Sequence, residues 1–429
     1  MPTPTAVRIR MYNVGFGDCF LLTFHYASGD RHILVDYGST AAPKNGPRNY
    51  MQLVAADIAK TCAGKLDVVI ATHRHRDHIS GFSTENDGTG KIIASLKPDH
   101  VIQPWTEDPA AKPDAMTATT TTDEKQITRH FLGSLEDMHQ VAAAVLKLSG
   151  DTKLAGRETL DQLKFLGEDN LKNLSAVENL MAMGRKGKAH YVNAGMKLNG
   201  ILPGVKITVL GPPTLKQSDS IRKERAKDPS EFWQFRSFWA SQQMAASAAA
   251  RQTTGSLFPA HRRASAAPPN FRWFIRQSRQ IQAEQMLELV RDLDSVMNNT
   301  SVILLLEIGD RKLLFPGDAQ IENWAFALNN PAWKKLLADV NVYKVGHHGS
   351  LNATPKSLWA LFSHKGDEHK HDRLETLCST KAGKHGNVKS GTEVPRHTLV
   401  DELKKDSDFV STEDFKKTIF QELTIKIGR

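Results

Sequence analysis

Short apolar runs that each end in a polar cluster recur along this chain. One run at 68–70 leads into Ala-Thr-His-Arg-His-Arg-Asp-His, and others at 33–35, 313–315 and 340–345 lead into Asp-Tyr-Gly, Pro-Gly-Asp and Gly-His-His-Gly-Ser. A short apolar run bounded by turn residues is typical of a buried strand. A loop that follows such a strand is held by a rigid sheet and is a common place for site residues. The pattern therefore predicts buried strands that position chemically active loops.

The loop at 71–78 holds three histidines and one aspartate within six residues: His73, His75, Asp77 and His78. Imidazole nitrogens and carboxylate oxygens suit zinc, manganese or iron. Four such groups are more than one tetrahedral ion uses comfortably, so the cluster predicts two neighbouring ions. The alternative is a solvated His/Arg loop, which a lone His-x-His would favour and which the motifs further along the chain argue against.

This spacing resembles the signature of the metallo-β-lactamase fold hydrolases. The resemblance implies an αββα sandwich, which is an α+β fold of two mixed β-sheets face to face, with helices outside and the site at one sheet edge. It also implies that His73 and His75 bind the first metal ion, and that Asp77 and His78 bind the second.

Three further motifs follow the order that this resemblance requires. Asp36 matches an early aspartate that orients the metal loop, although an Asp-x-Gly after a strand is by itself an ordinary turn. Asp318 matches the aspartate that bridges both ions, since a carboxylate can hold two cations about 3.5–4 Å apart. By position, His347 is the last ligand of the second ion. His348 is expected to pack beside the site or to contact the substrate.

A finer resemblance concerns the soluble hydrolase domain of the competence protein ComEC. Residues 12–22 are similar to its Val-Gly-Gln-Gly-Asp opening, and the segments 299–304 and 344–350 fit the same subgroup. Together with the motifs above, the likeness covers the segments 6–105, 200–215 and 298–400. That domain is associated with degrading the non-transferred DNA strand. The resemblance therefore implies a nuclease or another phosphodiesterase, from a bacterium.

The chain departs from the pattern where the family supplies one more histidine to the first ion. No candidate stands in an unmistakable context, and each is expected to be a surface histidine or one bonded within the fold. His190 is the best placed, because Tyr191-Val192 continue as a strand. Without such a ligand, the first ion is held by His73, His75 and Asp318. The histidines in this interval are His100, His130, His139, His190 and His261.

A second departure lies near the C-terminus. Related domains often carry a His-Pro on the substrate side after a Gly-Asn turn. Here Gly386-Asn387 is followed only later by Pro395-Arg396-His397. His397 is therefore a candidate active-site histidine that would donate a proton to an oxyanion or a leaving group.

Composition favours one decorated globular domain that spans residues 1–429. The chain is 40% hydrophobic and 24% charged, as is ordinary for a soluble protein. No apolar run approaches the roughly 18–20 residues that span a bilayer, and no signal segment precedes the first strand, so we expect a cytoplasmic protein without a membrane partner. Three widely spaced cysteines imply neither a disulfide framework nor a thiolate zinc site. Because the metal motifs straddle the middle of the chain, residues 106–197 and 216–297 are expected to be insertions.

The two predicted insertions differ in character. Residues 106–197 have a helical pattern and are expected to cap the site or to form a homodimer. Residues 216–297 concentrate much of the net charge of +9 and interleave arginines with aromatic residues, a chemistry that suits phosphate neutralisation and base stacking. The alternative is that the aromatic residues, which have helical spacing at 232, 235 and 239, pack this segment against the core. The candidates for contact with nucleic acid are Arg262, Arg263, Arg272 and Trp273.

These observations favour a hydrolase with two divalent metal ions, zinc first and manganese as the alternative. A metal-bound hydroxide would attack, because the cations pull the pKa of water toward ~7, and Asp77 would also steer a proton. The preferred substrate is nucleic acid. A rival hypothesis is hydrolysis of a small lactone, thioester or amide, since one fold serves many reactions. A third is a weakly catalytic binding module whose insertions dock a protein partner.

Overall fold

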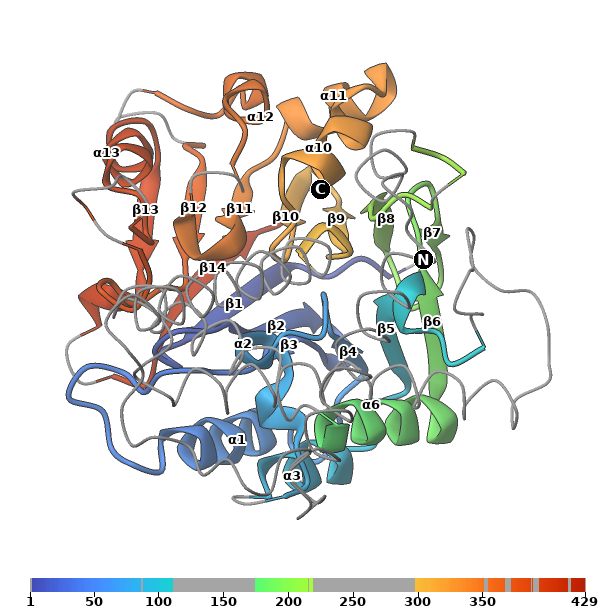
Figure 1. Cartoon of the computed structure of the whole chain (residues 1–429). Helices are drawn as coiled ribbons and strands as arrows, with labels where there is room; N and C mark the ends of the chain where they lie inside the picture. Colours follow the sequence, from blue (N-terminus) through green and yellow to red (C-terminus); the bar gives the residue numbers. More distant parts are fainter. Residues whose placement is uncertain are drawn as a thin grey trace, which may run out of the picture.

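Two β-sheets packed face to face form the centre of the molecule, and helices cover both outer faces (Figure 1). Within the described residues each sheet is mixed and has seven strands. This architecture confirms the predicted α+β sandwich. The computed structural model describes residues 2–85, 88–110, 174–214, 216–218, 298–350, 354–366, 372–386, 388, 393–415 and 418–428.

The first sheet has the order β14-β1-β2-β3-β4-β5-β6. Pairing is antiparallel from β14 to β3 and parallel from β3 to β6. The carboxyl ends of β3, β4 and β5 therefore meet at one edge of the sheet. The strands are β1 (Ala6–Tyr12), β2 (Cys19–Tyr26), β3 (Gly29–Tyr37), β4 (Val68–Ile70), β5 (His100–Pro104), β6 (Lys188–Val192) and β14 (Phe420–Lys426).

The second sheet has the order β13-β12-β11-β10-β9-β8-β7. Here β10 to β13 run parallel, and the remaining neighbours pair antiparallel. The apolar runs that predicted strands at 68–70, 313–315 and 340–345 correspond to β4, β10 and β11. The strands are β7 (Lys197–Leu198), β8 (Val205–Gly211), β9 (Ile303–Ile308), β10 (Arg311–Phe315), β11 (Val342–Lys344), β12 (Glu375–Cys378) and β13 (Asp408–Ser411).

Strand periodicity separates three layers of core. In β2, Phe20 and Leu22 face the space between the sheets, where the rings of Phe20 and Phe315 lie 5.7 Å apart, whereas Leu21 faces the outer helices. Each fully buried side chain of this size stabilises the fold by about 1.5–3 kcal/mol. The inter-sheet layer therefore holds the two sheets together.

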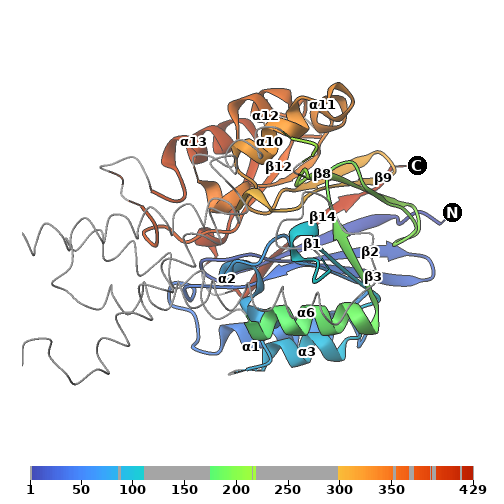
Figure 2. The same ribbon diagram turned by 45° about the vertical axis from the view of Figure 1, so that its right-hand side comes forward.

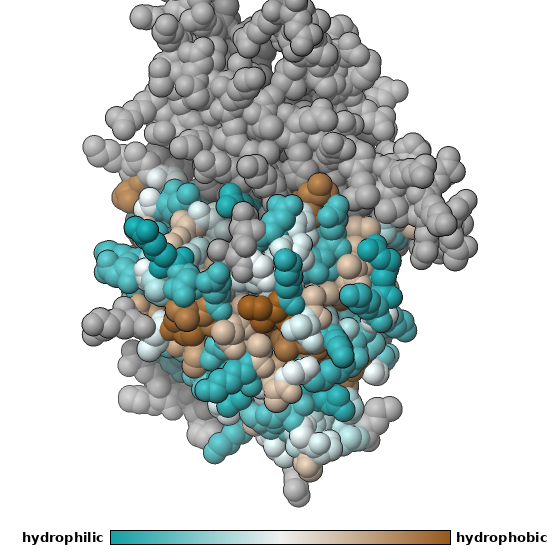
Figure 3. All heavy atoms as spheres, turned by 90° about the horizontal axis from the view of Figure 1, so that it is seen from below, coloured by the Kyte–Doolittle hydropathy of each residue, from teal (hydrophilic) through white to brown (hydrophobic). Residues whose placement is uncertain are grey.

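Helices cover the two outer faces separately (Figure 2). Seen from the side of α1 and α3, the described surface is mostly hydrophilic, with small apolar areas between polar side chains (Figure 3). No helix among the described residues is long and apolar enough to cross a membrane. The first sheet packs against α1 (Tyr50–Thr61), α3 (Thr89–Ser95) and α6 (Leu174–Lys186), and the second against α10 (Ile321–Leu328), α11 (Pro331–Ala338), α12 (Lys356–Leu361) and α13 (His397–Asp406).

The described part of the predicted 106–197 insertion includes elements of the sandwich itself. Val177 and Leu180 of α6 are buried against the first sheet, and β6 adds a parallel edge strand beside β5. The rest of this insertion from residue 111 to 173 lies outside the described residues, and so does the 216–297 insertion apart from 216–218. The nucleic-acid candidates Arg262, Arg263, Arg272 and Trp273 fall in that second segment.

Candidate metal centre

Loops from both sheets meet at one edge of the sandwich. The loop after β4 continues into the short helix α2 (Arg76–Ile79), and Asp318 follows β10. A short kinked turn, η3 (Gly346–Gly349), follows β11. Because β4, β10 and β11 all end at this edge, their loops bring together residues that are more than 200 positions apart in the sequence.

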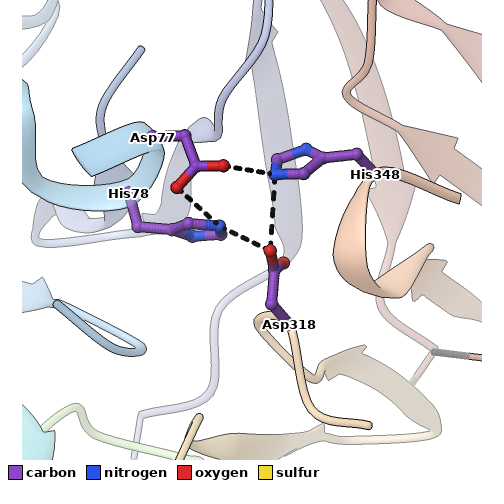
Figure 4. Close-up of side chains that lie close together, drawn as sticks. All are labelled: Asp77, His78, Asp318 and His348. Carbon is purple, nitrogen blue, oxygen red and sulfur yellow. Dashed lines mark hydrogen bonds and ion pairs between the residues drawn. The ribbon is translucent and has the colours of Figure 1, made fainter. Parts of the chain in front are cut away.

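Four side chains from these loops form a compact buried cluster: Asp77, His78, Asp318 and His348 (Figure 4). His78 Nε2 lies 3.0 Å from Asp318 Oδ2, and His348 Nε2 lies 3.1 Å from Asp77 Oδ2 and 3.4 Å from Asp318 Oδ2. One potential ligand atom of each residue lies within 4.8 Å of all the others. None of the four residues is more than 6% exposed.

A second group of potential ligands adjoins this cluster. His73 Nε2 and His75 Nδ1 are 3.0 Å apart, and both residues form a buried group with Asp77. Burial, followed by the neighbouring His78, holds the pKa of His73 well below its ordinary value. Burial also lowers the pKa of His75 to about 4. Both rings are therefore neutral near pH 7, which is the form that binds a metal ion.

The chemistry of these residues fits a divalent cation. Asp77 Oδ1 is buried and accepts no hydrogen bond from the described residues. It lies 3.9 Å from His78 Nε2, beyond hydrogen-bonding distance. A buried carboxylate oxygen without a hydrogen bond is costly, and a coordinated cation would satisfy it. Nitrogen and oxygen donors without thiolates suit zinc and manganese alike. These buried groups could thus hold a metal ion, as the sequence predicted.

Asp36 contacts the loop at 71–78, which carries the predicted metal ligands, on the side away from the cluster. Its carboxylate accepts hydrogen bonds from the backbone N–H and the hydroxyl of Thr72, each 2.7 Å long, and lies 2.8 Å from His78 Nδ1. Asp36 adopts a left-handed backbone (φ 54°). A carboxylate on Nδ1 leaves Nε2 of the same ring facing the cluster. This is the position expected for a group that orients the loop.

The two consecutive histidines of η3 make different side-chain contacts. The sequence predicted His347 as a metal ligand, whereas the structure places His348 in the four-residue cluster. His348 donates from Nδ1 to the carbonyl of Ser379 at 2.9 Å, so its Nε2 faces the carboxylates. His347 Nδ1 instead contacts Ser350 Oγ at 2.9 Å. Both histidines have positive φ (41° and 52°), and this tight turn separates their ring centroids by 6.3 Å.

Charge on His348 depends on its neighbours. Burial alone would lower its pKa, but Asp318 and Asp18 raise it to about 10. Burial also acts to lower the pKa of His78. Asp318 and Asp36 outweigh this effect and hold the pKa of His78 well above its ordinary value. The neighbouring carboxylates therefore favour the protonated form of both rings.

Asp18 and Lys344 are buried beside the cluster and were missed as site residues. Asp18 is 0% exposed and Lys344 is 2% exposed, and the two form an ion pair. Lys344 Nζ also lies 3.4 Å from Asp318 Oδ1. Burial lowers the pKa of Lys344, but the two carboxylates outweigh it, so the net shift is upward. The available signal was a lysine at the end of an otherwise apolar strand.

His385 lies near the cluster, beside Phe16, and was not predicted as a site residue. The ring of Phe16 lies 4.4 Å from that of His348 and 4.2 Å from that of His385. The loop of His385 is fixed by a backbone hydrogen bond from Val394 to its carbonyl at 3.1 Å. Burial and the adjacent Lys384 lower the pKa of His385 to about 3.

The remaining predicted histidines lie elsewhere. His397 begins α13, pairs with Glu393 and has a side chain that is 56% exposed; no hydrogen bond or ion pair among the described residues joins it to the cluster. His100 Nδ1 and His190 Nε2 contact each other at 2.9 Å on neighbouring strands, and neither belongs to a group of potential metal ligands among the described residues. The other candidates for the third ligand, His130, His139 and His261, lie outside the described residues.

No protein-family model matches this chain, and no curated protein matches it significantly. The likeness to metallo-β-lactamase fold hydrolases therefore stays a prediction from the motifs.

Proposed function

We propose that this protein is a metal-dependent hydrolase of the metallo-β-lactamase type, and that its substrate is a phosphodiester, with nucleic acid as the preferred class. The observation that carries this proposal is the buried cluster of Asp77, His78, Asp318 and His348 beside the His73–His75 pair. Six potential ligands from three loops are more than a structural ion pair needs. The proposed cofactors are two divalent ions, zinc first and manganese as the alternative.

In this proposal the four-residue cluster would hold one ion. His73 and His75 would hold the other, together with Asp318, the carboxylate that both ions share. Divalent ions in such a pair lower the pKa of water toward ~7 and stabilise charge on the entering and leaving oxygens. Both of these oxygens carry charge when phosphorus is attacked, so two cations suit a phosphodiester.

The protein's own groups have separate tasks. Asp36 holds Nδ1 of His78, so that Nε2 keeps its direction. Asp77 Oδ2 contacts His348, whereas its Oδ1 accepts no hydrogen bond from the described residues. Burial by itself would raise the pKa of Asp77, but the effects of His78 and His348 are larger and lower it. The net shift is downward, so the carboxylate is ionised. Asp77 is therefore the carboxylate that we assign to steer a proton during hydrolysis.

Charge supports a polyanionic substrate. The net charge is +9, and the segment 216–297 concentrates arginines with aromatic residues. Such a segment suits backbone neutralisation and base stacking. We assign the substrate contacts to Arg262, Arg263, Arg272 and Trp273, and the cytoplasm as the place of action.

The test is cleavage of labelled single- and double-stranded DNA and RNA by metal-depleted protein resupplied with zinc or manganese. The double variant Asp77→Ala/His78→Ala should lose cleavage at least about 100-fold. His190→Ala, which removes a histidine outside the cluster, is the matched control and should cleave like the wild type. Metal-loaded protein that cleaves a lactone, thioester or amide but no polynucleotide would replace the nuclease proposal with its rival. Loaded protein that cleaves neither class would favour a binding module.

A further inference from the structure

Lys344 makes three polar contacts inside the protein, all close to the cluster. It is the last residue of β11, and its Nζ forms an ion pair with Asp18. The same Nζ donates to the carbonyl of Gly317 at 3.1 Å and lies 3.4 Å from Asp318 Oδ1. An ammonium group has three donors, so each has an acceptor within reach.

These contacts distinguish the two oxygens of Asp318. Oδ1 faces Lys344 Nζ and accepts a hydrogen bond from the backbone N–H of His347 at 3.1 Å. Oδ2 faces His78 Nε2 at 3.0 Å and His348 Nε2 at 3.4 Å. Oδ1 therefore contacts Lys344 and the backbone of His347, and Oδ2 points toward the two histidines of the cluster.

Asp18 fixes the ammonium in this place. Its backbone N–H donates to the carbonyl of Asp77 at 2.9 Å, and its own carbonyl accepts from Gly38 N at 3.0 Å. The backbone of Asp18, immediately before β2, is therefore held in place by two hydrogen bonds. Asp18 also lies 3.7 Å from His78 Nδ1 and 3.6 Å from His348 Nδ1, so its charge reaches both rings of the cluster.

We infer that Lys344 is a positioning residue that reserves Oδ1 of Asp318 for the protein, so that Asp318 binds a metal ion through Oδ2 alone, and that Asp18 is the counter-charge that holds Lys344 there. This inference rests on the proposed metal centre. In this arrangement the ammonium group of Lys344 occupies the position beside Asp318 Oδ1 where a metal ion could otherwise bind.

Electrostatics gives the two partners opposite effects on metal affinity. Lys344→Met keeps the length of the side chain and removes a positive charge that repels the incoming cation, so metal should bind at least about tenfold tighter. Asp18→Asn keeps the shape and leaves the positive charge of Lys344 without its counter-charge, so metal should bind at least about tenfold weaker. A pair that only ties two loops together would instead weaken metal binding in both variants.

The experiment is a titration of the metal-depleted full chain with Zn²⁺ and separately with Mn²⁺, in competition with a chelator of known affinity. The variants are Lys344→Met, Asp18→Asn and their combination, which should have an affinity between those of the single variants. Lys312→Met is the matched control. It removes another strand lysine, which pairs with Asp339 away from the cluster, and should change affinity less than about threefold.

Opposite shifts in the two single variants support the inference, and shifts of the same sign or no shift overturn it. If Lys344→Met does not fold, Lys344→Gln takes its place: tighter binding by at least about tenfold supports the inference, and unchanged or weaker binding contradicts it. Wild-type protein that binds no metal would overturn the metal centre as well. Wild-type protein that binds metal and cleaves its substrate, while the variants fail to diverge, would overturn this inference alone.

Discussion

Asp36 Oδ2 lies 2.8 Å from His78 Nδ1, on the opposite side of the imidazole from the cluster. This contact joins a strand of the first sheet to the metal loop, and both residues are at most 1% exposed. An acceptor on Nδ1 fixes both the tautomer and the direction of the ring. The contact explains how the loop after β4 can present Nε2 toward residues of the second sheet.

Replacing Asp36 tests that explanation. Asp36→Asn keeps the shape but loses the charge that stabilises the His78 N–H, so metal affinity should fall by about 10–100-fold. Thr89→Ser, a similarly mild change at the buried first residue of α3, serves as the control. Unchanged affinity for zinc in a direct titration of Asp36→Asn would show that Asp36 does not orient the ligand.

The two histidines of η3 should behave differently. His348→Ala removes a member of the cluster, so metal should lose most of its stabilising effect, which reaches about 2.7 kcal/mol when the metal concentration is 100 times the Kd. His347→Ala removes a ring that contacts Ser350 and should retain more of that effect. Thermal unfolding with and without zinc measures both. A larger loss in His347→Ala would restore the assignment made from the sequence.

Glu375 on β12 predicts a pH dependence that is independent of metal. Burial and the facing Asp408 raise its pKa from 4.5 to about 7, against the effect of Arg373. The folded state therefore favours the protonated form. This stabilising contribution is complete below about pH 4.5, and it is lost as the pH rises through about 7.

Glu375→Gln mimics the protonated group and should remove this loss. Urea unfolding of both proteins from about pH 4 to about pH 8 measures the difference in free energy of unfolding. The advantage of Glu375→Gln should grow with pH across the window and become constant above it. An advantage that is constant over the whole range would contradict the raised pKa.

Local pattern was enough to predict the buried strands and most of the metal loop, whereas the sandwich was predicted from the resemblance to a family. The runs that became β4, β10 and β11 are apolar because both faces of these strands are covered, one by the opposite sheet and one by helices. His73, His75, Asp77 and His78 lie so close in sequence that one turn after β4 brings them together. Their proximity needed no knowledge of the strand order.

Other features depend on geometry that sequence spacing does not encode. Whether His347 or His348 enters the cluster is decided by two successive left-handed residues, and either order would satisfy the motif. The ion pair of Asp18 with Lys344 joins segments from different sheets. The packing of the two sheets against each other brings these segments together, and a single sequence does not reveal how the sheets pack.

The count of tightly bound metal ions per chain tests the central claim most directly. Elemental analysis after zinc loading and removal of free metal would be made on the wild type, on Asp77→Ala/His78→Ala and on the control His190→Ala. We predict about two ions in the wild type and the control, and a loss of at least one in the double variant. Wild-type protein without metal, or a double variant with as much metal as the wild type, would contradict a metal centre at this cluster.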